Sequence, residues 1–305
     1  MRTVRIGTRG SRLAKWQAEW VQSKLMAAGV QAELVVIQTL GDQQLETALY
    51  QMGSKGLFTK ALDEALISNE IDLAVHSTKD IPTEFEDSLE LGIILKREDP
   101  RDVLVGLREE VHFENLNQSF KIGTSSLRRQ ALIHHYFPGH TLLDVRGNLD
   151  TRIEKLKNGL YDGLVLAYAG VKRLGLNSFI RQKFNVNVIT PAVAQGAIGV
   201  IYRKSDDDQM IWKEILNDVT TFTEILAERA FLRKMEAGCH APVFGLATLT
   251  GNLLSIDAGI ASIDGKNLIR QSLDGLAVDA EFLGTSVAES VLALGGKSML
   301  HGIKN

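Results

Sequence analysis

The stretch TVRIGTRGSRLAKWQAEWVQSKLMAAG, residues 3–29, decides the fold class of this chain. Residues 3–7 form a short apolar run that predicts a strand, and residues 11–29 repeat apolar side chains at helical spacing until a glycine ends the pattern. We expect one face of this helix to carry Leu13, Trp16, Trp20 and Leu25. A strand followed at once by an amphipathic helix is typical of α/β sheets.

The strand–helix alternation continues beyond this stretch and then starts again. A helix over 58–70 separates strands over 32–39 and 71–77, which completes a βαβαβ pattern and predicts a mostly parallel sheet. After the charged segment 96–102 the pattern recurs, with strands over 121–124, 141–147 and 162–170 and helices over 125–136 and 148–159. The sequence therefore predicts two tandem α/β units.

A different composition begins near residue 217. A helix over 220–236, capped by Thr221 or Thr223, precedes strand-like runs over 246–273 that are broken by Thr-Gly-Asn and Asp-Gly-Lys turns. A closing helix over 280–294 completes the region. We expect a small C-terminal α+β domain with an antiparallel sheet.

The composition is that of an ordinary globular chain, with 45% hydrophobic and 23% charged residues among 305. A net charge of −3 argues against a general nucleic-acid binder. The charged beginning predicts neither a signal peptide nor a membrane anchor, so we expect a cytoplasmic protein. A single cysteine agrees with a reducing compartment.

Polar residues gather where the predicted strands end, at the edge where open α/β sheets usually bind ligands. They are TRGS (8–11), HSTKDIP (76–82) and GTSSLRRQ (123–130). Each one alone is more often a helix cap or a loop charge pair. Between residues 121 and 173, however, there are nine basic residues and only four acidic ones. The arginines among them lie mainly at the ends of predicted elements, which suits recognition of carboxylate or phosphate.

The cysteine, Cys239, stands in the stretch MEAGCHAPV (235–243). It has no second cysteine for a disulfide and too few neighbouring ligands for a structural metal, so we predict no metal site. Its residues alone leave two readings open: a small buried hydrophobe, which is the common fate of a free cysteine, or a reactive thiol.

Nine motifs in order resemble the hydroxymethylbilane synthase (porphobilinogen deaminase) family. They are TRGS, GSKGLFTK, DLAVHSTKDIP, REDPRD, GTSSLRRQ, RGNLDTR, LAYAGVKRLGL, PAVAQGA and EAGCHAPV, and they span nearly the whole chain. Each motif is weak alone, but nine with matching spacings are specific.

The resemblance implies two type II periplasmic-binding-protein-like α/β domains and a small α+β domain. Their expected extents are 1–96 plus about 197–214, 97–196 and 215–305. It implies a transferase that condenses four porphobilinogen molecules onto a covalent dipyrromethane cofactor, loses ammonia each time, and releases linear hydroxymethylbilane by hydrolysis. It also implies a cytoplasmic monomer without nucleic-acid or membrane partners.

The resemblance assigns roles residue by residue. Asp80 matches the catalytic aspartate and Cys239 the thioether attachment site. Cofactor-binding positions are Asp42, Ser77, Lys79, Thr124, Ser125, Ser126, Arg128, Arg129, Arg146 and Gly147. Substrate-binding positions are Arg9, Ser11, Lys55, Arg146, Arg152, Arg173 and Gln195.

Some positions depart from the family pattern. Gln51 replaces a frequent lysine, and Ala237, Phe244 and Arg12 also differ, without removing a catalytic group. Three alternatives stay open. A solute-binding protein of the same fold would need neither Cys239 nor Asp80, a pyridoxal phosphate enzyme would use Lys55, and a cysteine hydrolase would pair Cys239 with His240.

Overall fold

The computed structural model describes residues 2–38, 59–84, 86–115, 118–237 and 241–304. The chain divides into two compact units, each built from two stretches of sequence. The first unit comprises Met1–Glu98 and Gly196–Phe222, and the second comprises Asp99–Gln195 and Thr223–Asn305.

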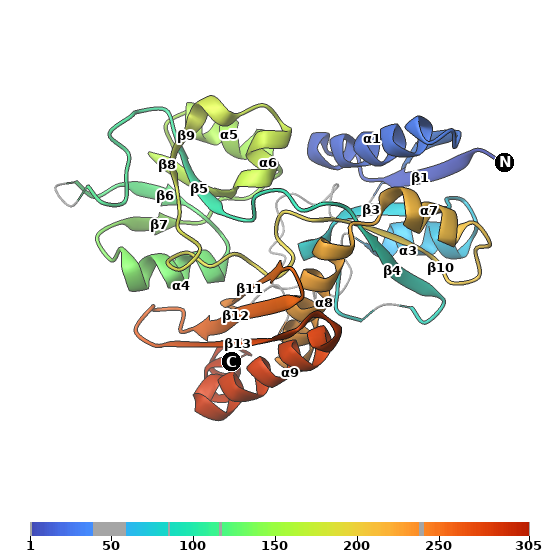
Figure 1. The fold of residues 1–305 in the computed structure, drawn as a ribbon. Helices are drawn as coiled ribbons and strands as arrows, with labels where there is room; N and C mark the ends of the chain where they lie inside the picture. Colours follow the sequence, from blue (N-terminus) through green and yellow to red (C-terminus); the bar gives the residue numbers. More distant parts are fainter. Residues whose placement is uncertain (1, 39–58, 85, 116–117, 238–240, 305) are drawn as a thin grey trace. The chain divides into compact units, whose positions relative to one another are not determined.

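The first unit is built on a five-stranded mixed sheet in the order β2-β1-β3-β10-β4. Its strands are β1 (Val4–Thr8), β2 (Ala32–Val36), β3 (Leu73–Ser77), β4 (Leu89–Ile94) and β10 (Ile198–Arg203). The first three are parallel, whereas β10 is antiparallel to both of its neighbours. Figure 1 shows β10, drawn in gold, beside β3, although more than a hundred residues separate them in sequence.

Helices cover both faces of this sheet. They are α1 (Arg12–Ala27), α3 (Lys60–Ile67) and α7 (Gln209–Leu216). Ile6 and Val75 pack in one buried cluster with Trp212 of α7, and Leu62 of α3 packs with Ala74 in the other. Burial on two sides explains why β3 reads as a continuous apolar run.

The first helix buries a face that overlaps only in part with the predicted one: Leu25 is buried and Trp16 packs half-buried against the core. Its buried residues are Gln17, Ala18, Val21 and Leu25. Trp20 is 44% exposed, and its ring stacks on that of Trp16. The helix begins as its sequence indicates, because Ser11 Oγ accepts a hydrogen bond from the Ala14 N–H.

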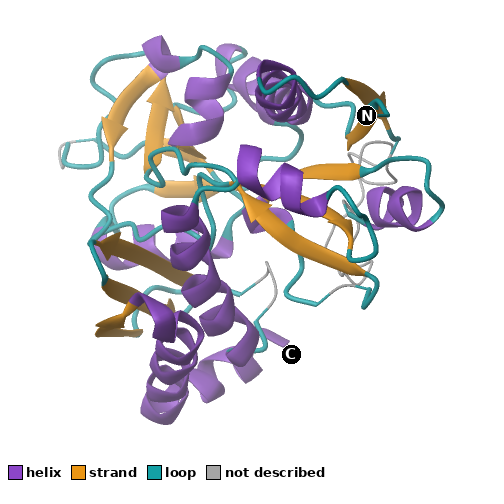
Figure 2. Ribbon diagram, turned by 45° about the vertical axis from the view of Figure 1, so that its right-hand side comes forward, coloured by secondary structure: helices purple, strands orange, loops and turns teal. Residues whose placement is uncertain are grey.

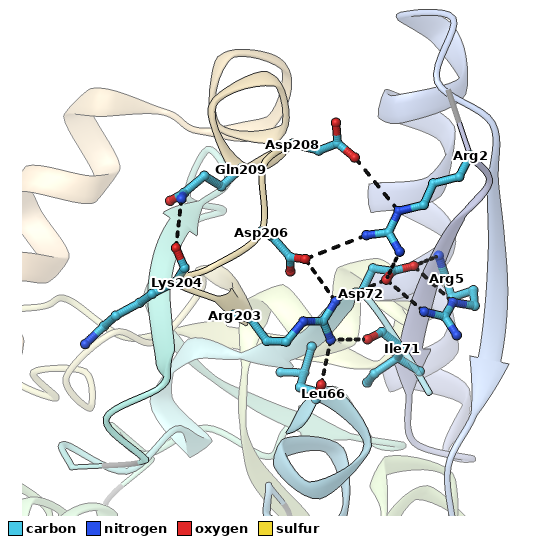
Figure 3. A network of polar contacts seen from close by, with 10 residues as sticks. All are labelled: Arg2, Arg5, Leu66, Ile71, Asp72, Arg203, Lys204, Asp206, Asp208 and Gln209. Carbon is cyan, nitrogen blue, oxygen red and sulfur yellow. Dashed lines mark hydrogen bonds and ion pairs between the residues drawn. The ribbon is translucent and has the colours of Figure 1, made fainter. Parts of the chain in front are cut away.

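A network of ion pairs closes the end of the sheet where β1 and β3 begin (Figure 3). The buried carboxylate of Asp72 accepts from Arg5 at 2.9 Å and from Arg203 at 3.2 Å. Arg203 also donates to the carbonyl oxygens of Leu66 and Ile71. The network joins the antiparallel strand β10 to the parallel strands.

The second unit begins with another five-stranded sheet in the same arrangement, β7-β6-β8-β5-β9. Its strands are β5 (Asp102–Gly106), β6 (Lys121–Gly123), β7 (Thr141–Leu143), β8 (Gly163–Ala167) and β9 (Ile180–Lys183). Its helices are α4 (Leu127–Tyr136), α5 (Leu149–Lys157) and α6 (Tyr168–Arg173). The predicted strand over 162–170 is too long, because residues from Tyr168 onward are helical.

The C-terminal part is an antiparallel sheet of β11 (Val243–Thr250), β12 (Leu253–Ala261) and β13 (Leu268–Leu276). Its helices are α8 (Val219–Lys234), α9 (Ala280–Val291) and α10 (Lys297–Lys304), and α9 packs on β12 and β13 (Figure 2). Neither predicted threonine caps α8; Asp218 Oδ1 instead accepts from the Thr221 N–H. The predicted fold class, two tandem α/β sheets and a small antiparallel α+β region, is confirmed.

Candidate active site

In the first unit, the loops that follow β1 and β3 lie at one edge of the sheet. The two strands are parallel neighbours, with Gly7 paired to Ala74, so both run out at the same edge. The β1 loop carries half-buried Arg9 and Ser11. Ser77 ends β3, and its Oγ accepts from Gln17 Nε2 of α1 at 2.9 Å. The structure thus brings together these predicted positions of the first unit.

The predicted catalytic aspartate lies in a short 3-10 turn, Thr78–Asp80, directly after β3. The turn is anchored at its start, because the Thr78 N–H donates to the Ala197 carbonyl at 3.1 Å. Thr78 is buried, Lys79 is half-buried and Asp80 is exposed. An exposed carboxylate on an anchored turn can approach a bound molecule without being needed for packing.

His76, next to this turn, was not singled out by sequence reasoning. Its side chain is buried, and its Nε2 has no hydrogen-bond partner among the described residues. Burial, together with the nearby charge of Arg9, lowers the pKa of His76 to about 4. The imidazole is therefore neutral near pH 7.

In the second unit, three parallel strands end at one edge. β6 pairs with β7 and with β8, and the loops after all three carry predicted site residues. Ser125 Oγ accepts from the Val145 N–H and donates to the Val145 carbonyl, each at 2.9 Å. Thr124 is buried and its N–H donates to the Leu143 carbonyl. These bonds fix the β6 and β7 loops to each other.

The β7 loop brings further predicted residues to this edge. Gly147 has a φ of +105°, and an added Cβ would lie 2.8 Å from Thr151 Cβ, so only glycine fits without strain. Arg152, in the first half of α5, donates from Nε to the Gly147 carbonyl at 2.8 Å. Arg146 is exposed in the loop itself, and Arg173 is half-buried at the end of α6.

Three predicted site residues instead converge on one buried carboxylate. Asp102 Oδ2 accepts from Arg128 Nη2 at 2.7 Å, and Oδ1 accepts from Arg129 Nη2 at 2.7 Å. Gln195 Nε2 donates to Oδ1 at 2.9 Å. Burial alone would raise the pKa of Asp102, but the two guanidinium groups outweigh it and hold that pKa well below its usual range. Sequence reasoning quoted Asp102 within REDPRD and gave it no role.

Other predicted positions lie outside the described residues. They are Asp42, Lys55, Cys239 and the neighbouring His240. The flanks of the cysteine loop are described: Ala237 is buried, and Glu236 has a φ of +49°. A positive φ in a non-glycine residue is uncommon and turns the chain sharply where α8 ends.

The described arginines suit a ligand with several carboxylates. No group of three or more His, Asp or Glu residues that could hold a metal ion occurs in the described part of the chain. Guanidinium groups instead stand at the ends of β6, β7 and β8, and arginine binds carboxylates through paired N–H groups. One buried N–H, at Arg128 Nε, lacks an acceptor among the described residues. These features fit the carboxylate side chains of a dipyrromethane.

No helix within the described ranges is long and apolar enough to cross a membrane. Solved structures that resemble the chain share little sequence with it. A VFT2 domain of BvgS from Bordetella pertussis is 13% identical with a TM-score of 0.41, covering 69% of this chain and 84% of that one. A TRAP periplasmic solute binding protein from Desulfovibrio salexigens is 13% identical with a TM-score of 0.42, covering 72% of each chain.

Sequence comparisons are far more specific. Residues 4–211 match the family model "Porphobilinogen deaminase, dipyromethane cofactor binding domain", and residues 222–293 match "Porphobilinogen deaminase, C-terminal domain". The porphobilinogen deaminase of Trichlorobacter lovleyi is 44% identical over 98% of this chain and 96% of its own length. That of Geobacter sulfurreducens is 43% identical over 97% and 93%. The chain belongs to the porphobilinogen deaminase family.

Proposed function

We propose that this protein is a hydroxymethylbilane synthase, a transferase of tetrapyrrole biosynthesis. It joins four porphobilinogen molecules head to tail, with loss of ammonia at each step, and releases the linear product by hydrolysis. The observation that carries this function is full-length similarity to porphobilinogen deaminases, including the two family-model matches. The loops at the two sheet edges supply residues suited to this chemistry.

Asp80 is proposed as the catalytic residue. Loss of ammonia from porphobilinogen leaves a pyrrolic cation, and a nearby carboxylate stabilises positive charge and can exchange protons with the pyrrole N–H. The exposed side chain of Asp80, on a turn anchored to Ala197 just before β10, suits that task. Arg9 and Ser11 come from the same sheet edge and would orient substrate, and Ser77 and Lys79 of this edge would contact the cofactor.

The arginines are proposed to bind the acetate and propionate groups. Each pyrrole brings two carboxylates, so a growing chain accumulates negative charge that cationic side chains must balance. Arg146, Arg152 and Arg173 stand at one edge of the second sheet, where Thr124, Ser125, Ser126 and Gly147 add polar and backbone groups.

A dipyrromethane bound through Cys239 would supply the fixed acceptor onto which the first substrate is joined. The residues proposed to hold its carboxylates are Arg128, Arg129 and Arg146, with Lys79, Ser77 and Asp42 as further contacts. Lys55 and Gln195 are proposed on the substrate side. We propose a thioether link, a cytoplasmic monomer, and three domains with the extents expected from the sequence.

The test is turnover of porphobilinogen by the purified protein, followed as ammonia release and linear tetrapyrrole formation. Asp80→Asn removes the negative charge and keeps the shape, and loss of such stabilisation costs on the order of a hundredfold in rate or more. Asp87→Asn, another exposed carboxylate of the first unit, is the control and should keep wild-type turnover. Tight binding of porphobilinogen without turnover by the wild type would instead support a solute-binding protein.

A further inference from the structure

The cluster around Asp102 holds more positive than negative charge. Two buried guanidinium groups, of Arg128 and Arg129, meet one buried carboxylate, so the cluster carries one net positive charge. The network around Asp72 differs, because its three arginines face three aspartates, Asp72, Asp206 and Asp208. A buried net charge is costly unless something pairs with it.

The two arginines of the cluster are held differently. All three nitrogens of Arg129 have acceptors, since Nε and Nη2 donate to Asp102 and Nη1 donates to the Val165 carbonyl. Arg128 donates through Nη2 to Asp102 and through Nη1 to the Thr190 carbonyl, whereas its buried Nε has no acceptor among the described residues. The cluster therefore has one donor without an acceptor, at Arg128 Nε, and one positive charge without a partner among the described residues.

Asp102 is placed to fix this arrangement. Asp102 is the first residue of β5 and lies opposite Ala167, the last residue of the antiparallel strand β8. It therefore lies at the sheet edge that carries the β6 and β8 loops. Its two oxygens receive Arg128 and Arg129 from α4 and Gln195 from a second, distant stretch of chain. Gln195 follows Ala194, whose N–H is held by the buried carboxylate of Glu228 at 2.6 Å. No other described carboxylate accepts from both arginines.

We propose that Asp102 is a positioning residue that aligns Arg128, Arg129 and Gln195 and leaves the cluster able to accept one pyrrole carboxylate, through Arg128. The inference rests on the proposed function for the identity of the ligand. Arg129, proposed above as a cofactor contact from the family resemblance, is assigned a positioning role instead, because all three of its nitrogens already have acceptors in the protein. Cancelling one guanidinium charge also prevents the two arginines from repelling each other at close range.

The test compares Asp102→Asn with Asp102→Glu by steady-state kinetics and by calorimetric Kd, using porphobilinogen with the intact holoenzyme. A purely electrostatic role predicts tighter binding by Asp102→Asn, because the variant gains one positive charge. Positioning predicts the opposite: KM and Kd should rise on the order of 10- to 100-fold in both variants, since misplacement by about 1 Å can cost a hundredfold. An unchanged or lower KM in both variants overturns the proposal.

Asp162→Asn is the matched control. Asp162 pairs with Arg108 at 2.6 Å in the same unit, next to the start of β8, at the opposite edge of the sheet, and should keep wild-type KM. If Asp102 served only to stabilise the fold, its variants would have a smaller active fraction and therefore a lower kcat, but an unchanged KM. An unchanged KM therefore distinguishes a structural role from the positioning role. If Asp102→Asn does not fold, Asp102→Glu decides: it keeps the charge, so a raised KM supports positioning and a wild-type KM overturns it.

Failure of the proposed function looks different. The wild type and Asp162→Asn would then both lack turnover, and Kd alone would decide the inference. A higher Kd in the Asp102 variants would still support a positioned carboxylate site. Absence of porphobilinogen binding by the wild type would overturn both proposals.

Discussion

A neutral histidine lies buried four residues before the proposed catalytic aspartate. The pKa of His76 is lowered to about 4 by burial and by the charge of Arg9, against an unfolded value near 6.5. Between these values the unfolded chain binds a proton that the folded chain does not. The free energy of unfolding should therefore fall as pH drops through this window, by about 3 kcal/mol at most.

Denaturant unfolding of the wild type and His76→Gln at about pH 7 and about pH 4.5 tests this pH dependence. The wild type should lose more stability than the variant on acidification. Asp63 acts in the opposite direction, because burial raises its pKa to about 6, but it is present in both proteins and cancels in the difference. Equal losses in the two proteins would show that His76 does not titrate in this way.

Single residues also show what sequence could and could not predict. Asp80 and Ser77 follow a recognisable strand end, so their place at the sheet edge could be read from the pattern. The contact of Asp102 with Arg128 and Gln195 could not, because it joins residues 26 and 93 positions apart. An aspartate at the end of the charged segment 96–102 gives no local sign of being fully buried.

At the scale of elements, α5 offers two cations in contrasting settings. Arg152 is half-buried and bonded to the Gly147 carbonyl, whereas Lys157 is exposed and paired with Glu154 at 3.0 Å. Arg152→Met should lower kcat/KM by about tenfold or more, because a bidentate carboxylate partner is lost. Lys157→Met removes the same charge and should stay within about twofold, since exposed pairs contribute little.

Steady-state kinetics with porphobilinogen measure both α5 variants. Lys155 would be a poor control, because its Nζ donates to the Arg146 carbonyl at 3.1 Å and so supports the β7 loop. Equal and small effects of the Arg152 and Lys157 substitutions would contradict a carboxylate-binding role for this end of α5.

The loop that leads into α5 depends on one glycine. Gly147→Ala forces a side chain into a φ of +105° and places Cβ against Thr151, so we expect a loss of about 1–3 kcal/mol in the free energy of unfolding. Gly139→Ala is the control, because nothing lies within 4 Å of its added Cβ and its φ is ordinary. Denaturant midpoints measure both. Equal midpoints for the two variants would mean that the loop relaxes without cost.

At the scale of the whole molecule, the sheet order is what local patterns could not predict. Hydrophobic periodicity gave the parallel strands β1, β2 and β3, but β10 reaches this sheet only after the chain has built a second one. The chain leaves the first unit near Glu98 and returns to it near Gly196, and the Glu98 N–H donates to the Gly196 carbonyl. Gly196 has a φ of +94°, and an added Cβ would lie 2.5 Å from Glu98 O. Only the family resemblance predicted that the chain returns to the first unit after about residue 197.

The last prediction concerns the proposed attachment of dipyrromethane at Cys239. A thiolate is the competent nucleophile, and we expect it to attack the same pyrrolic cation that arises in each substrate addition, so the protein would assemble its cofactor from substrate. The thioether is not the bond that hydrolysis cleaves, so the group would remain. Intact mass should show the wild type heavier than its sequence by two linked pyrrole units.

Cys239→Ser should remain folded, carry little or no bound group and lose most turnover. Its melting temperature should also fall by several degrees relative to the wild type, because a group that contacts only the folded chain stabilises that state. Mass spectrometry and thermal unfolding of both proteins measure these differences. The two readouts separate the possible failures: an active wild type with the bare polypeptide mass would make Cys239 a buried small hydrophobe, whereas a loaded Ser variant would place the attachment at another residue.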